Sequence, residues 1–141
     1  MEPLGVLADY LIQLQDLLGG KYGVLSRPQL RLMLKLKAGP RTVSELKELL
    51  RLSSPGVTQM LDKLQTAGWI ARRGLPHDLR MVQVELTDSG RSVLVEAESA
   101  FVQRVAELLG VLSGEEVEAL TRLLESVLSG QARGGPTHER G

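Results

Sequence analysis

The chain has 141 residues, of which 43% are hydrophobic and 24% charged, as expected for one globular domain or one short elaborated domain. Cysteine is absent and only two histidines are present, which excludes thiol chemistry and disulfides and disfavours zinc. No apolar run reaches the length of a membrane span and no signal-peptide pattern begins the chain. We therefore expect a cytoplasmic protein without a metal site or a cofactor.

Charge is distributed very unevenly along the chain. Seventeen Lys and Arg balance seventeen Asp and Glu, so the formal net charge is zero. Residues 21–81 nevertheless carry twelve basic and four acidic side chains, a net charge of +8, and the two flanks together carry −8. This pattern indicates that the middle segment meets an anion and that the flanks have another role.

Residues 1–20 are predicted to form a helix that is apolar on more than one side. Leucines recur at spacings of three and four, and Val6, Tyr10 and Leu17 begin a second stripe. Two apolar stripes require two partners, so we expect this helix to pack against a second subunit as well as its own core. The leucines assigned to dimerisation are Leu4, Leu7, Leu11, Leu14 and Leu18.

Two capping boxes mark the starts of short helices in the basic segment. Ser26 and Gln29 form the first box, ahead of a helix that stops before Gly39-Pro40 and uses Leu30, Met33 and Leu34. Thr42 and Glu45 form the second box, and that helix can run only two or three turns.

A third helix is predicted between residues 54 and 67. Ser54 is a suitable N-cap and Pro55 suits the first helical position. Its apolar face consists of Val57, Leu61 and Leu64, with Met60 beside them, and its other face is polar.

Two strands and two longer helices complete the chain. Residues 69–73 and 81–86 are expected to pair through a hairpin tip at residues 74–80, and Thr87 caps the next helix. Ser113 starts the last helix, and residues 131–141 are expected to form a disordered tail. Apolar residues of these helices assigned to dimerisation are Phe101, Leu108, Leu120 and Leu124.

Two short helices followed by a hairpin within a basic segment indicate a winged helix-turn-helix. The expected fold is mainly α with a small β-hairpin wing, in which residues 21–86 bind DNA and residues 1–20 and 87–130 dimerise. The third helix would enter a major groove, which is about 12 Å wide, and the wing would reach the minor groove. The candidate DNA-binding residues of the third helix are Ser53, Ser54, Gly56, Thr58, Gln59 and Lys63. Those of the wing are Arg72, Arg73 and Arg80.

Four short motifs, in this order, resemble the multiple antibiotic resistance regulator (MarR) family of bacterial transcription factors. They are Thr58-Gln-Met-Leu-Asp-Lys-Leu64, Gly68-Trp-Ile, Asp78-Leu-Arg80, and Val84-Glu-Leu-Thr87 with Gly90. The resemblance implies a homodimer on a pseudo-palindromic operator, with Asp78 orienting Arg80 in the wing. It also implies repression that a small, anionic and lipophilic ligand relieves.

Some features depart from that family pattern or leave alternatives open. A basic residue is common in the family at the position of Gln59, where glutamine is suited to reading adenine instead. Lys21 or Arg27 are candidates for binding an anionic ligand near the first two helices.

A winged-helix module that binds other proteins and no duplex is the alternative function. An enzyme is not expected, because the two histidines, His77 and His138, lie in a hairpin tip and a tail.

Overall fold

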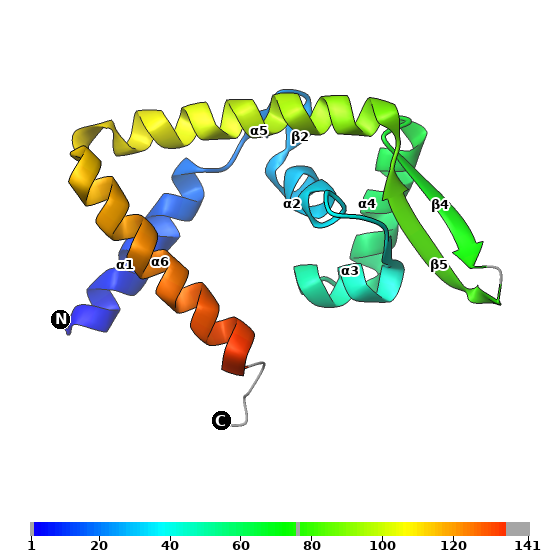
Figure 1. Ribbon diagram of the computed structural model, residues 1–141, viewed down its shortest axis with the longest axis horizontal. Coiled ribbons are helices and arrows are strands. Elements are labelled where there is room, and N and C mark those ends of the chain that lie inside the picture. The colour runs from blue at the N-terminus through cyan, green and yellow to red at the C-terminus, as the bar shows by residue number, and fades with distance from the viewer. Residues whose placement is uncertain (1, 76, 135–141) are drawn as a thin grey trace. The chain divides into compact units, whose positions relative to one another are not determined.

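The computed structural model describes residues 2–75 and 77–134, apart from the side chains of residues 78–80, 133 and 134. The chain divides into two units, Met1–Arg104 and Val105–Gly141, which are described in turn. Mainly helical structure with a small antiparallel sheet confirms the expected fold class (Figure 1). The elements of the first unit are α1 (Pro3–Leu17), β1 (Lys21–Tyr22), β2 (Leu25–Ser26), α2 (Arg27–Lys35), β3 (Arg41–Thr42), α3 (Val43–Leu50), α4 (Ser54–Thr66), β4 (Ile70–Leu75), β5 (Asp78–Leu86) and the start of α5 (Asp88–Leu108).

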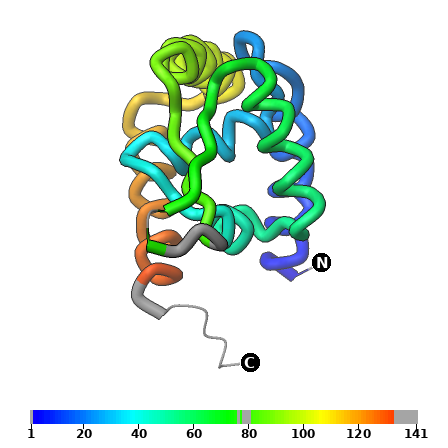
Figure 2. The backbone as a smooth tube through the Cα atoms, turned by 90° about the vertical axis from the view of Figure 1, so that its right-hand side faces the viewer, coloured from blue at the N-terminus to red at the C-terminus, as the bar shows by residue number. Residues whose placement is uncertain are grey.

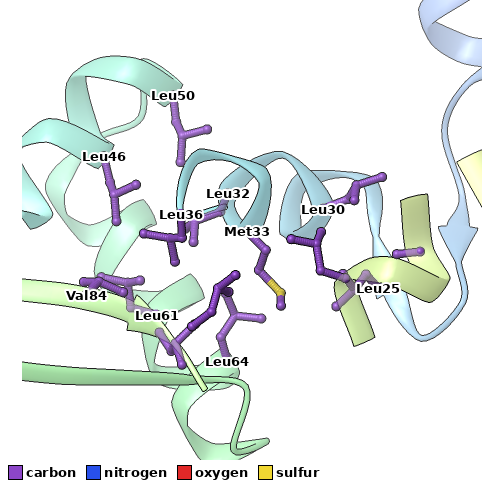
Figure 3. Close-up of a cluster of buried hydrophobic side chains, with 14 of the residues drawn as sticks. Leu25, Leu30, Leu32, Met33, Leu36, Leu46, Leu50, Leu61, Leu64 and Val84 are labelled. Carbon is purple, nitrogen blue, oxygen red and sulfur yellow. The ribbon is translucent and has the colours of Figure 1, made fainter. Parts of the chain in front are cut away.

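The core of the first unit surrounds α2. Leu32 and Met33 are fully buried, and Figure 3 shows them between the leucines of α3 and those of α4. Leu34, another apolar residue of the predicted helix, lies outside this core, since it is 38% exposed. The buried face of α2 is centred on Met33 and is wide enough to include Leu36. Helix α3 and the β1 and β2 strands both contact α2, which widens its buried face.

Three antiparallel strands in the order β3-β5-β4 form the wing sheet. Ile70 pairs with Leu86 at its base, and the pairing continues outward to Leu75 and Asp78 with an irregularity after Gly74. The hairpin tip was predicted to span residues 74–80 and is shorter than that. Backbone pairing between β4 and β5 continues beyond the residues whose side chains alternate between apolar and polar. The short strand β3 was not predicted, because two residues carry no periodic signal of their own.

The wing is joined to α5 by close backbone contacts. Thr87 donates its hydroxyl to the Gly68 carbonyl at 2.7 Å and accepts the Gly90 amide at 3.0 Å. Gly90 lies so close to Trp69 that a Cβ there would be 2.0 Å from the Trp69 carbonyl oxygen. The Thr87-x-x-Gly90 pattern thus has a physical cause: threonine caps the helix and glycine admits the neighbouring backbone.

The second unit contains the end of α5, a 3₁₀ turn (Leu109–Val111) and α6 (Gly114–Gly134). The predicted helix start at Ser113 is confirmed. It is a capping box, in which the Ser113 hydroxyl accepts the Glu116 amide at 3.1 Å and Glu116 Oε1 accepts the Ser113 amide at 2.8 Å. The α6 helix continues past the residue at which the tail was expected to begin, and residues 135–141 lie outside the described residues. Among the helices that are described, none is sufficiently long and apolar to cross a membrane.

Candidate nucleic-acid interface

The N-cap of α4 lies one residue earlier than the sequence predicts. Ser53, not Ser54, is the N-cap, and its side chain accepts the Gly56 amide at 3.2 Å. Both serines are chemically able to cap, so composition alone does not choose between them. In the structure Ser53 is the N-cap, whereas the Ser54 hydroxyl accepts a hydrogen bond from Lys47 of α3 at 2.8 Å. Lys47 was not singled out as a site residue in the sequence.

One face of α4 is polar and exposed along its length. Thr58, Gln59 and Lys63 are exposed, and Gly56 is half-buried at the first turn. The opposite face is held in the core by three fully or almost fully buried side chains, Val57, Leu61 and Leu64. This confirms the predicted division of the helix into a packed face and an accessible one.

Arg72 of the wing is directed toward α4. Its guanidinium donates to Gln65 Oε1 at 2.6 Å and to Asp62 Oδ1 at 2.7 Å. Only 26% of the Arg72 side chain is exposed, whereas Asp62 is 60% exposed. The contact therefore links β4 to the accessible side of α4, and Figure 2 shows the chain turning back from the end of α4 into β4.

The other wing residues singled out in the sequence fall into two groups. Arg73 points away from the core, is 64% exposed, and forms an ion pair with Glu85 across the β4-β5 ladder. Asp78 and Arg80 belong to β5, but their side chains lie outside the described part of the structure. Whether Asp78 orients Arg80 therefore stays a prediction.

Two hollows flank the accessible face of α4. A cavity of about 620 Å³ lies between the start of α3, α4 and the wing, and is lined in part by Ser44, Thr58 and Arg72. A smaller hollow of about 170 Å³ lies between the start of α2 and α4, beside Gln59 and Lys63. Neither is lined by Lys21 or Arg27, the cations that the sequence put forward for an anionic ligand.

The residues assigned to dimerisation are largely accessible in the single chain. α1 has no buried residue, and its first four stripe leucines are between 41% and 71% exposed. Leu124 of α6 is also 51% exposed, whereas Leu18, Leu108 and Leu120 are half-buried. Phe101 packs edge-on against Tyr22 of its own chain, with ring centroids 4.9 Å apart.

No group of three or more His, Asp or Glu among the described residues is arranged to hold an ion.

Known proteins resemble the chain over nearly its whole length. A model described as "MarR family" matches residues 25–81, which run from β2 to the wing. The multiple antibiotic resistance protein MarR of Salmonella typhimurium is 33% identical over 131 residues, covering 89% of this chain and 91% of that protein.

The chain belongs to the MarR family. Solved structures agree with this assignment. A mutant of Escherichia coli MarR is 32% identical and covers 91% of this chain and 98% of its own, with a TM-score of 0.78. A structure of mutant E. coli MarR complexed with operator DNA has a TM-score of 0.71 at 32% identity, covering 89% and 94% of the two chains. The resemblance inferred from the short motifs is thus confirmed, and this MarR-family chain is a transcriptional regulator.

Proposed function

We propose that this chain is a homodimer that binds duplex DNA sequence-specifically and represses transcription until a small ligand relieves it. The observation that carries the proposal is the exposed polar face of α4 beside a wing with two arginines, in a MarR-family chain. A relative of the same fold is complexed with operator DNA. We place this activity in the cytoplasm and propose no catalytic role.

The α4 helix and the wing have separate roles in this proposal. Thr58 and Gln59 read base edges in the major groove, where glutamine bonds adenine through two hydrogen bonds. Lys63 neutralises a phosphate, while Arg73 and Arg80 approach the minor groove. Arg72, held by Asp62 and Gln65, keeps the wing at a defined position against α4.

Dimerisation follows from the apolar surface left uncovered on α1 and α6. Leu4 is 71% exposed and Leu128 is 67% exposed, which is unfavourable for large apolar side chains in water. A second copy that covers these helices would remove that surface from water. Two recognition helices in one dimer require half-sites about one helical turn apart.

The cavity between α3, α4 and the wing is the place we propose for the relieving ligand. Arg73 lies beside the bound Arg72 in its lining, while Met81 and Val82 supply apolar surface, so an anionic and lipophilic molecule matches it. A ligand there would lie between the two elements that approach the duplex. Titration with such a ligand should release bound DNA, and a Met81→Glu variant, which places a negative charge in the cavity, should need more of it.

Footprinting and salt titration test the DNA-binding proposal together. The full chain is mixed with duplexes from the region upstream of its own gene and with a random duplex at about 50 mM salt. We expect a protected pseudo-palindrome and a logarithmic salt slope that falls by about 0.9 for each phosphate neutralised. Absence of binding to every duplex at low salt would overturn the proposal and favour the alternative, a module that binds only proteins.

A further inference from the structure

Arg51 has a backbone conformation that normally belongs to glycine. Its φ of 56° and ψ of 45° are left-handed, and no other non-glycine residue of the described chain has a positive φ. The conformation ends α3: the Arg51 amide donates to the Glu48 carbonyl and the Leu52 amide to that of Lys47, at 3.3 and 3.2 Å. Glycine is strongly favoured at this position because a Cβ is strained there.

The Arg51 side chain does not contribute to the packing or hydrogen bonding of the described chain. It is exposed, and it has no hydrogen bond or ion pair within the part of the chain that the structure describes. Neighbouring cations differ in this respect, since Lys47 donates to Ser54 and Arg41 donates to the Lys35 carbonyl. A strained residue whose side chain stabilises nothing in its own chain indicates a functional reason for its presence.

The position of Arg51 indicates what that function is. It precedes the N-cap of α4, Ser53, by two residues, so the two Cα atoms are no more than about 7.6 Å apart. The ammonium group of Lys47 lies at the same end of α4, through its bond to Ser54. Two cations thus lie where a helix entering the major groove would meet the sugar-phosphate strand beside that groove.

We infer that Arg51 binds a backbone phosphate of the operator from the turn between α3 and α4. This inference rests on the proposed DNA binding and adds a contact that carries affinity and no base preference. The left-handed backbone directs a long cation outward at this turn. Glycine would relax the turn but would offer no charge.

Three substitutions separate the charge of Arg51 from its backbone. Arg51→Gly removes the charge and relaxes the backbone, Arg51→Gln removes the charge only, and Arg51→Lys keeps both charge and strain. The measurements are thermal unfolding and duplex affinity against salt concentration. Arg122→Gln on α6, also exposed, is the matched control.

We expect Arg51→Gly to raise Tm and yet to weaken binding. In a dimer on two half-sites, Arg51→Gly and Arg51→Gln should each lower the slope of log affinity against log salt by about 0.9 per half-site. At about 0.15 M salt this corresponds to a loss of about 30-fold in affinity. Arg51→Lys should retain the slope, and the control should change neither quantity. Unchanged affinity and slope in the Gly and Gln variants, with normal wild-type binding, would overturn this inference alone. Failure of the wild type to bind would overturn the proposed function instead.

Discussion

Gly90 shows how a single missing side chain determines a contact between elements. A Cβ at this position would lie 2.0 Å from the Trp69 carbonyl oxygen, and that atom is backbone and cannot swing aside. We therefore expect Gly90→Ala to lower the free energy of unfolding by about 3 kcal/mol, the upper end of the usual cost of overpacking. Gly110→Ala is the control, because nothing lies within 4 Å of a Cβ there. Urea denaturation measures both, and equal stability of the two variants would contradict the contact.

Gln59 and Lys63 are both exposed on α4 but should differ in what they contribute. Gln59→Ala should cost about 1–3 kcal/mol on the preferred operator and little on a random duplex, since it removes bonds to a base. Lys63→Ala should weaken both duplexes alike and reduce the salt slope by about 0.9 per half-site. Affinity measurements on the two duplexes check this. A uniform loss for Gln59→Ala would rule out base reading.

The sequence alone predicted the N-caps of several helices, but it did not predict which side chains distant in sequence form hydrogen bonds. Ser26, Thr42 and Ser113 were predicted to cap, and all three accept the expected amide, because the signal spans only three residues. The partners of Arg72 could not be found this way. Asp62 and Gln65 lie on another element, and only the packing of β4 against α4 brings them near.

At the scale of elements, the wing and α4 should behave as one positioned pair. Arg72→Met removes the bonds to Asp62 and Gln65 while keeping an apolar stem. We expect weaker operator binding without a change in salt slope, because Arg72 is occupied within the protein. Arg73→Met, on the outward side of the same strand, should lower the slope as well. Equal slopes for these two variants would contradict the separate roles.

Strand boundaries show the limit of pattern reading at this scale. β5 begins at Asp78, although the strand predicted from the apolar alternation begins only at Met81. β3 consists of Arg41 and Thr42 and exists because Val84 and Gln83, far along the chain, pair with them. Helices with wide apolar faces were predicted more reliably, since each helix is stabilised by bonds within its own segment.

At the scale of the whole molecule, α1 should be an interface. Leu7 and Leu11 are 50% and 49% exposed on neighbouring turns. The double variant Leu7→Glu, Leu11→Glu should sediment as a monomer at micromolar concentration and lose most of its operator affinity. Val24→Glu, at a residue 52% exposed outside α1, should remain dimeric. A double variant that still sediments as a dimer would exclude α1 from the interface.

Net charge is the property of the whole chain that was most misleading at first. A total of zero argues against nucleic acid, yet residues 21–81 carry +8 and contain the accessible face of α4. The acidic flanks should keep α1 and α6 away from the duplex.

The pairing of Arg73 with Glu85 gives the wing an internal competitor for phosphate. A phosphate that binds Arg73 in the proposed complex would compete with that carboxylate for the guanidinium, and an exposed pair of this kind is worth about 0–1 kcal/mol. The penalty applies at every site on a chromosome, whereas only the operator compensates for it with base contacts. If Arg73 contacts DNA as proposed, we expect the carboxylate to shorten the time spent on unrelated sequence and so to speed the search for the operator.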